Sequence, residues 1–226
     1  MILASHQPDF FPYMGYFYKI CQSDVFVFSD NVQYSKSGRH NYNEILAANG
    51  PRRFTLPIHY HCVDINKIEI AADESTVNKM LKALVQEYKK AEHFSEVFPV
   101  IEYLLRKATT AENLAEFNIK CILEFVERFG LGVRAFYKSS ELALEGRKDV
   151  RIISMCKQVG ADTYYSGTAA KDYHHEIDFE NNGIRLIYSD YKPVIYQQVG
   201  GRSTANMSVI DYVFNCGFNL PRGWMK

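Results

Sequence analysis

The sequence predicts an α/β fold in which helices cover a parallel, Rossmann-like sheet and a helical insertion interrupts that sheet. Two short apolar runs near the N-terminus enclose a segment with helical spacing, and strands and helices alternate again after residue 134. Between these regions, residues 75–130 carry apolar side chains at three- and four-residue spacing. We therefore expect residues 1–226 to form one α/β domain with a helical insertion at about 75–130.

The first elements form a predicted βαβ unit. Apolar residues 2–5 are typical of a buried strand, which polar and proline residues then end. The spacing of Tyr13, Phe17 and Ile20 predicts a short helix that begins close to a proline. Residues 25–28 (VFVF) predict the second strand, and a helix between two strands favours parallel pairing.

The later segments extend this pattern. The turn sequence at residues 49–51 (NGP) predicts a hairpin between strands at 41–46 and 54–61, and residues 65–70 are a weaker strand candidate. The remaining predicted helices cover residues 75–88, 94–107, 112–129, 150–159 and 208–215, and the remaining predicted strands cover 134–138, 163–165 and 184–188.

The composition argues against several classes of protein. Twenty-six basic and twenty-six acidic residues balance, and no basic run exceeds two residues, so we expect no nucleic-acid partner. No stretch approaches the roughly 20 apolar residues of a membrane span, and the apolar start is too short for a signal peptide. Five cysteines without CxxC spacing are typical of reduced thiols, so we expect a cytoplasmic protein.

The strongest candidate site is the segment at residues 6–16 (HQPDFFPYMGY). It leaves the first predicted strand and enters the first helix, where ligands bind in open α/β sheets and where helix amides attract anions. A rigid proline-rich turn with a structural histidine is the alternative interpretation. The candidate site residues in this segment are His6, Gln7, Asp9, Tyr13, Gly15 and Tyr16.

Two further loops follow predicted strands. The loop after the second strand offers an acidic group, Asp30, and side chains that suit an anionic substrate, but an ordinary solvated loop explains it equally well. Its candidate binding residues are Gln33, Lys36, Arg39 and Asn41. The loop after residue 165 carries small and hydroxylated residues that favour a phosphate or carboxylate, or alternatively a helix cap. Its candidates are Ser166, Gly167, Thr168 and Lys171.

We expect no metal site. His59 and His61 lie on one face of a predicted strand, but two imidazoles without a clear third ligand are a weak zinc pattern. The sequence names no other cofactor, and it indicates no oligomeric state.

Motifs spread along nearly the whole chain match those of one known family. They lie at residues 6–17, 24–28, 30–36, 165–167, 171–173, 208–211 and 214–217. Together they resemble the WbqC-like family, with a modest departure at Tyr13, where a tryptophan is commoner. The resemblance implies a role in O-antigen biosynthesis in bacteria, including glycine or other aminoacyl transfer to a sugar precursor.

A second resemblance concerns the nucleotidylyltransferases of the HIGH superfamily. Residues 11–16 (FPYMGY) keep the proline and glycine of that motif but carry Tyr13 and Tyr16 in place of its two histidines. Residues 165–171 (YSGTAAK) are similar to a second motif, with lysine in place of arginine. This resemblance implies a related fold with an altered ligand.

We therefore expect a transferase that binds a small molecule, either a nucleotide-sugar or an activated amino acid. His6 would act as general base, Asp9 or Asp30 would orient it, and cationic side chains would hold anionic groups. The alternative is a non-catalytic module that binds a nucleotide-sugar or a partner protein, with the ligand stacked on Tyr13 and Tyr16.

Overall fold

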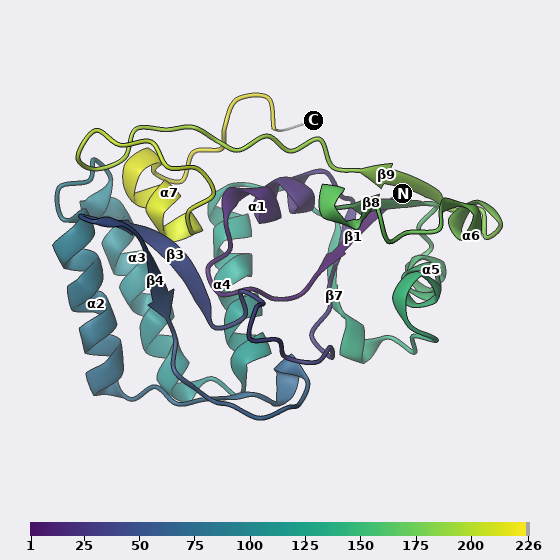
Figure 1. Ribbon diagram of the computed structural model, residues 1–226, viewed down its shortest axis with the longest axis horizontal. Coiled ribbons are helices and arrows are strands. Elements are labelled where there is room, and N and C mark those ends of the chain that lie inside the picture. The colour runs from purple at the N-terminus through teal and green to yellow at the C-terminus, as the bar shows by residue number, and fades with distance from the viewer. Residues whose placement is uncertain (225–226) are drawn as a thin grey trace.

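The centre of the fold is a five-stranded sheet in which every strand runs parallel to its neighbours. A computed structural model describes residues 1–224 (Figure 1). The strand order is β7-β2-β1-β8-β9, with β1 at Ile2–His6, β2 at Val25–Phe28, β7 at Ala135–Lys138, β8 at Thr163–Ser166 and β9 at Arg185–Tyr188. The predicted Rossmann-like α/β fold is therefore confirmed.

Side chains on the strands alternate between two hydrophobic cores, one on each face of the sheet. Phe26 and Phe28 of β2 point into the larger core, whereas Val25 and Val27 point into the smaller one. Nearly continuous apolar strands are expected when both faces of a parallel sheet are covered.

Different helices cover the two faces. Helices α1 (Met14–Cys21) and α4 (Leu114–Arg128) contribute to the larger core. Helix α5 (Lys148–Val159) contributes to the smaller core, as does Phe179 of α6 (Glu176–Glu180). Figure 1 shows α5 and α6 together at one end of the molecule, away from the helices of the insertion.

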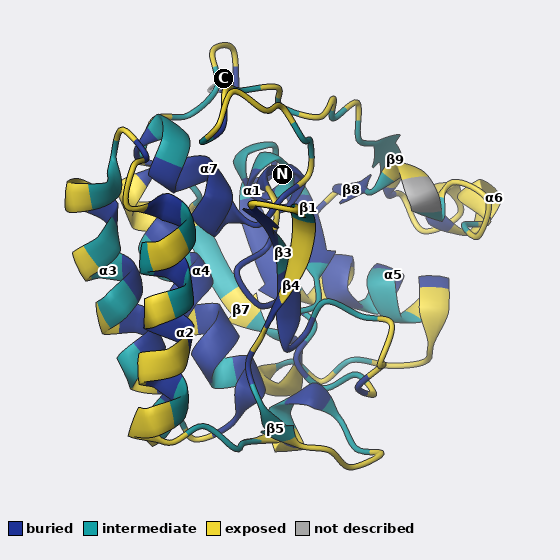
Figure 2. Cartoon of the chain, turned by 60° about the vertical axis from the view of Figure 1, so that its left-hand side comes forward, coloured by how far each residue is buried: buried dark blue, intermediate teal, exposed yellow. Residues whose placement is uncertain are grey.

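The segment between β2 and β7 contains the predicted helices and a hairpin. The helices are α2 (Glu74–Tyr88), α3 (Phe94–Arg106) and α4, and Asp73 and Asn113 cap α2 and α4. Figure 2 shows that these helices bury one side and expose the other. The C-terminal helix α7 (Val209–Cys216) packs against α3 and the hairpin.

The hairpin forms at the predicted turn, but one predicted strand is wrong. β3 (Tyr42–Ala47) pairs antiparallel with β4 (Gly50–Thr55). The continuous strand predicted at 54–61 is instead broken, because Pro57 has no amide hydrogen and its carbonyl accepts from Ala71 outside the hairpin. A separate short strand, β5 (Ile58–His59), then pairs with β6 (Glu69–Ile70).

The strand order creates a switch point between β1 and β8. From β1 the chain crosses through α1 to β2, and from β8 it crosses through α6 to β9 on the other side. Since α1 and α6 cover opposite faces, the loops that leave β1 and β8 diverge. Such a divergence opens a crevice at the carboxyl ends of the strands, where ligands of this fold class bind.

No helix within residues 1–224 is long and apolar enough to span a membrane.

Candidate functional site

A cavity of about 400 Å³ lies at this switch point. The volume is within the range of small-molecule sites, which is roughly 300–1,000 Å³. The cavity brings together residues that follow β1 and residues that follow β8. Its lining residues are His6, Tyr13, Gly15, Tyr16, Lys19, Ile152, Tyr164, Ser166, Gly167, Thr168, Ala170, His174, Ser189 and Tyr191.

His6 stands at the end of β1, with its side chain 39% exposed. Its Nδ1 lies 3.0 Å from the carbonyl oxygen of Gln7. Since a carbonyl can only accept, Nδ1 carries the hydrogen, and Nε2 keeps a lone pair that can accept a proton. Tyr16 supports the same carbonyl with a 3.0 Å hydrogen bond from its hydroxyl, and its ring meets the imidazole edge to face at 4.8 Å.

Desolvation by the cavity walls lowers the pKa of His6 below its ordinary value, although the ring still reaches solvent. Asp9 partly offsets this effect, and Lys19 adds to it. The imidazole is therefore neutral at neutral pH, which is the form that a general base needs.

Asp9 lies behind His6 and not in the cavity. Its carboxylate stands 3.8 Å from Nδ1 of His6 and 3.2 Å from Nδ1 of His40. His40 is fully buried, and a Cβ at Gly38 would lie 2.2 Å from its Nε2, so a side chain at position 38 would displace that ring. Asp9 thus lies close enough to His6 for its charge to act on the imidazole, and His40 is a neighbour that the sequence analysis missed.

Lys19 is a lining residue that the sequence analysis also missed. Its Nζ donates a 2.8 Å hydrogen bond to the carbonyl oxygen of Ser5. Burial lowers its pKa to about 8, so at pH 7 most of the molecules still carry the positive charge. The signal was present in the sequence, because Lys19 follows Gly15 and Tyr16 at the helical spacings of four and three residues.

Tyr13 and Gly15 form the mouth of the cavity. The Tyr13 ring lies over the first turn of α1, where a Cβ on Gly15 would stand 2.3 Å from ring atom Cε2. Gly15 is one of the predicted site residues, and the space that its missing side chain leaves is used by the Tyr13 ring. Tyr13 is 37% exposed and meets Tyr191 edge to face at 5.9 Å, whereas Tyr16 is only 2% exposed. A ligand therefore has access to the face of Tyr13 but not to that of Tyr16.

The opposite wall follows β8 and contains three predicted residues, Ser166, Gly167 and Thr168. It also contains His174, whose Nε2 lies 2.9 Å from Oγ of Ser166. On the other side of the ring, Nδ1 of His174 lies 2.7 Å from a carboxylate oxygen of Asp149. No local pattern pointed to this contact, because Asp149 precedes Ser166 by a whole helix.

Asp30 lies outside the cavity and is 2% exposed. It accepts hydrogen bonds from the amide and the hydroxyl of Ser140, from the hydroxyl of Ser139 and from the side chain of Asn66. These donors belong to two short helical turns, η3 (Ser139–Glu141) and η1 (Ile65–Lys67). The carboxylate fastens these turns to the end of β2.

The other predicted binding residues after β2 also lie away from the cavity. Lys36 stacks on Tyr60, with Nζ 4.5 Å from the ring centroid, and Arg39 forms a 3.1 Å ion pair with Glu44. Gln33 donates to Cys62, and Asn41 donates to the carbonyl of Leu56. Two predicted residues of the other loops also lie outside the cavity lining: Gln7, which follows β1, and Lys171, which follows β8 and is exposed near the ring of Tyr188.

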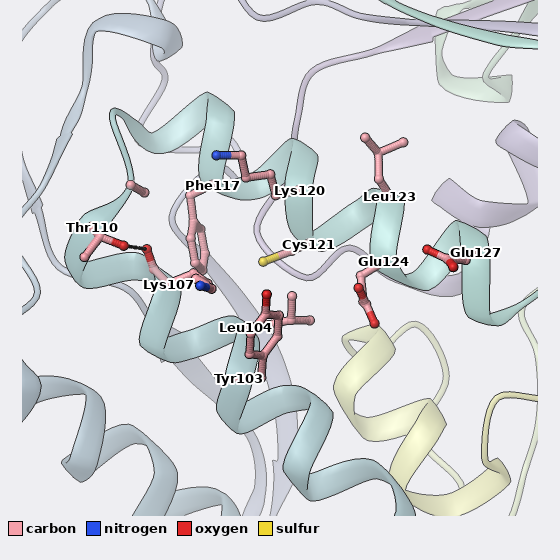
Figure 3. A pocket seen from close by; sticks show the side chains of 11 residues that line it. Tyr103, Leu104, Lys107, Thr110, Phe117, Lys120, Cys121, Leu123, Glu124 and Glu127 are labelled. Atoms are coloured by element: carbon pink, nitrogen blue, oxygen red, sulfur yellow. Dashed lines mark hydrogen bonds between the residues drawn. The ribbon is translucent and has the colours of Figure 1, made fainter.

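A second cavity, of about 540 Å³, opens between α3 and α4. Figure 3 shows Tyr103 and Lys107 on one side of it and Cys121 and Glu124 on the other. Burial raises the pKa of the Cys121 thiol, which makes this sulfur a poor nucleophile. This cavity has no imidazole among its lining residues, and it lies between helices and not at the switch point of the sheet, so the cavity at the switch point is the stronger candidate.

Within residues 1–224, no group of three or more His, Cys, Asp or Glu side chains is arranged to hold a metal ion.

Comparison with known proteins places the chain in a family. A model of the WbqC-like protein family matches residues 7–222. The chain belongs to this family. The resemblance predicted from the sequence motifs is thereby confirmed, and the matched region includes Lys19, Asp149, Ser166 and His174.

The WbqC-like chain is also similar to a protein of Mycobacterium tuberculosis described as the uncharacterized protein Rv1507c. The two are 29% identical over 224 residues, which cover 97% of this chain and 95% of the mycobacterial protein. No solved structure matches the chain.

Proposed function

We propose that this WbqC-like protein is a transferase that binds an activated donor in the switch-point cavity and passes an acyl group to a sugar precursor. The transferred group would be an aminoacyl group such as glycine, and the product would enter bacterial surface polysaccharide. The observation that carries the proposal is that one cavity holds both a neutral imidazole, His6, and a cation, Lys19. Acyl transfer needs both a base for the attacking group and a counter-charge for an anionic donor.

His6 supplies the base in this proposal. Its Nδ1 is engaged by the Gln7 carbonyl, so Nε2 is the atom that takes a proton from the hydroxyl or amine of the acceptor. Asp9, 3.8 Å from Nδ1, favours the imidazolium that forms as the proton arrives. Asp30, with its oxygens already engaged by four donor groups, has no part in this chemistry.

Lys19 and the start of α1 supply the positive charge. No side chain caps the N-terminus of α1, and this helix end faces the same cavity through Gly15. A bound phosphate or carboxylate would raise the depressed pKa of Lys19 again, so the charge is strongest when the donor is present. Ser166, Gly167 and Thr168 bound the donor on the opposite side.

We further propose that the fold is related to that of the HIGH-superfamily nucleotidylyltransferases. The parallel order β7-β2-β1-β8-β9 and the cavity beside β1 support this relation. The donor would then carry a nucleotide or a similar phosphate-bearing group, with Tyr13 against its ring. Precursors of this kind are made in the cytoplasm, which is where we propose that the protein acts.

A binding module without turnover is the second candidate. The observation that favours it is the exposed ring of Tyr13 at the cavity mouth, beside Tyr191. Aromatic faces at the entrance of a cavity bind sugar and base rings without any chemistry. The two candidates differ in whether the bound donor leaves unchanged.

The test is a transfer assay with a substitution at His6. Nucleotides, nucleotide-sugars and aminoacyl donors are first screened by thermal shift, since a ligand that binds the native state must stabilise it. Products from the stabilising donors are then followed by mass spectrometry in the wild type and in His6→Gln. We expect turnover to fall about 10²- to 10⁴-fold in the variant, with a melting temperature close to that of the wild type.

His59→Gln is the matched control, because His59 is an exposed histidine on β5 outside the cavity. It should keep full activity. Unchanged turnover in His6→Gln would contradict the base assignment, and a stabilising donor that is always recovered intact would favour the binding module.

A further inference from the structure

Three side chains from separate elements form a hydrogen-bonded chain at the wall opposite His6. Ser166 ends β8, His174 lies in the loop before α6, and Asp149 is in the first turn of α5. Ser166 Oγ is 2.9 Å from Nε2 of His174, and Nδ1 of the same ring is 2.7 Å from Oδ1 of Asp149. Figure 1 shows α5, α6 and β8 on the same side of the molecule, away from α2 and α3.

The proton positions follow from the partners. An ionised carboxylate only accepts, so Nδ1 of His174 carries a hydrogen and donates it to Asp149. The lone pair of Nε2 then accepts the hydroxyl hydrogen of Ser166. This is the order of contacts by which a carboxylate orients an imidazole and the imidazole activates a serine in acyl-transfer enzymes.

The three hydrogen-bonded side chains are packed firmly and are shielded from water. The His174 and Asp149 side chains are 7% and 10% exposed. The His174 ring packs edge to face against Phe179 at 5.4 Å and Tyr164 at 6.2 Å. The second oxygen of Asp149 accepts the backbone amide of His175 at 2.9 Å, which fixes the loop that carries the imidazole.

The serine end of this hydrogen-bonded triad faces the candidate site. Ser166 and His174 both line the switch-point cavity, together with His6 and Lys19, while Asp149 stays behind the imidazole. The cavity therefore has an imidazole on each side of the switch point. Only His174 holds a serine hydroxyl, whereas His6 leaves Nε2 free for a second group.

We propose that Ser166 is a nucleophile that carries the acyl group between donor and acceptor. This inference rests on the proposed function, and it specifies the donor as an activated acyl ester, thioester or acyl phosphate. Ser166 Oγ would form a bond to the acyl carbon while its proton passes to Nε2 of His174. The bond from the acyl carbon to the leaving group then breaks, and the leaving group departs as its anion (a phenolate, thiolate or phosphate), so Nε2 of His174 keeps the proton.

The second half of the reaction regenerates the serine. The hydroxyl or amine of the sugar acceptor attacks the acyl-serine and gives up its proton to Nε2 of His6. The bond between the acyl carbon and Ser166 Oγ breaks, and the serine oxygen takes the proton from Nε2 of His174. His6 then releases its proton to water, which leaves both imidazoles neutral for the next donor. Because His174 must still hold its proton at this step, the donor needs a leaving group that departs as an anion.

The experiment is covalent labelling with p-nitrophenyl acetate, a simple activated acyl ester. Wild type, Ser166→Ala and His174→Gln are followed by intact mass, and the labelled peptide is then sequenced. We expect one acetyl group on Ser166 in the wild type, none at this position in Ser166→Ala, and labelling at least about 100-fold slower in His174→Gln. The control is Ser37→Ala, because Ser37 is an exposed serine in the loop after β2 and its variant should label like the wild type.

Ser166→Ala removes one oxygen and leaves the Asp149–His174 pair in place, so it tests reactivity without disturbing the anchor of the loop. A purely structural role for the three residues predicts equal acetylation of wild type and Ser166→Ala, and that result would overturn the proposal. So would the absence of any acetylated Ser166 peptide in the folded wild type.

The same variants separate this inference from the proposed function. If Ser166→Ala still makes the transfer product, the nucleophile assignment fails while the transferase proposal stands. If Ser166 is acetylated and exchanges its acyl group with water, but no sugar acceptor ever receives it, the nucleophile is supported and the transfer to a sugar is wrong.

Discussion

Two boundaries between neighbouring strands, β2/β7 and β1/β8, carry similar polar residues but differ in what surrounds them. Between β2 and β7, Asp30 meets Ser139 and Ser140, and the turn η3 fills the space beyond the strand ends. Between β1 and β8, His6 and Ser166 face a cavity of about 400 Å³. At the first boundary the turn η3 covers the polar side chains. At the second boundary the polar side chains line an open cavity.

The difference comes from topology and not from residue type. Successive crossovers from β1 to β2 and from β2 to β7 move in one direction across the sheet, and the chain after β2 can fold back over the strand ends. At β1 and β8 the crossovers move apart, and neither loop closes over the other. Polar residues at strand ends thus become a site only where the connections diverge.

The largest effect is expected at the boundary between β2 and β7, where Asp30 is buried. Asp30→Ala removes a buried carboxylate that accepts four hydrogen bonds, and so it releases the turns that carry Ser140 and Asn66. We expect a loss of about 3 kcal/mol in the free energy of unfolding, measured by urea denaturation, with the activity of each folded molecule unchanged. Asp64→Ala, at a half-exposed carboxylate with one ion pair, should lose less than about 1 kcal/mol. A stable Asp30→Ala protein without activity would restore the catalytic role that the sequence suggested.

An intermediate effect is expected at Lys19, on the open boundary. Lys19→Met should weaken the binding of an anionic donor about 10- to 100-fold, as measured by titration calorimetry, because it removes the cation of the cavity. Lys36→Met, in an exposed loop outside the cavity, should bind normally. Equal affinity in the two variants would show that the donor does not meet Lys19.

Lys19→Met should also change how the stability of the ligand-free protein depends on pH. The pKa of Lys19 falls from 10.5 to about 8 on folding, so between these values the unfolded chain holds more protons than the folded protein. Stability therefore rises with pH across this window through Lys19, and Lys19→Met should lack that part of the rise.

The smallest effect is expected at the cavity mouth. Gly15→Ala places a methyl group where the Tyr13 ring now lies, and the ring must move away because the two would be 2.3 Å apart. Helix α1 gains up to about 1 kcal/mol from the substitution, which offsets the lost ring contact, so we expect little change in melting temperature. Donor affinity should fall about threefold, or about 0.7 kcal/mol. Unchanged affinity would remove Tyr13 from the binding surface.

Local patterns in the sequence were sufficient to predict the sheet and one wall of the cavity. The apolar runs of β1 and β2 and the proline-rich loop between β1 and α1 are contiguous, so their periodicity and turn residues show directly. The second wall was predicted only in part: Ser166 was identified, but neither His174 nor Asp149 was. Their contact depends on how α5 packs beside β8, and no short-range pattern encodes that arrangement.

The role of Asp30 also could not be predicted from local sequence. An acidic residue after a strand looks the same in a sequence whether its oxygens are free or engaged. Its partner Ser139 lies 109 positions later in the chain. Only long-range packing distinguishes a carboxylate that reacts from one that fastens two turns.

The buried side chain of Asn118 links the helical insertion to the first loop of the sheet. From α4 it donates to the carbonyl oxygens of Pro8 at 2.8 Å and of His40 at 2.7 Å. Pro8 precedes Asp9 in the chain, and the His40 ring lies against the Asp9 carboxylate. The backbone of this loop also includes Phe11 at a φ of +40°, a conformation that a bulky residue adopts only under external constraint. Helix α4 therefore works as a brace for the loop that follows β1, and a shortened chain without this helix would release the loop that holds Asp9 beside His6.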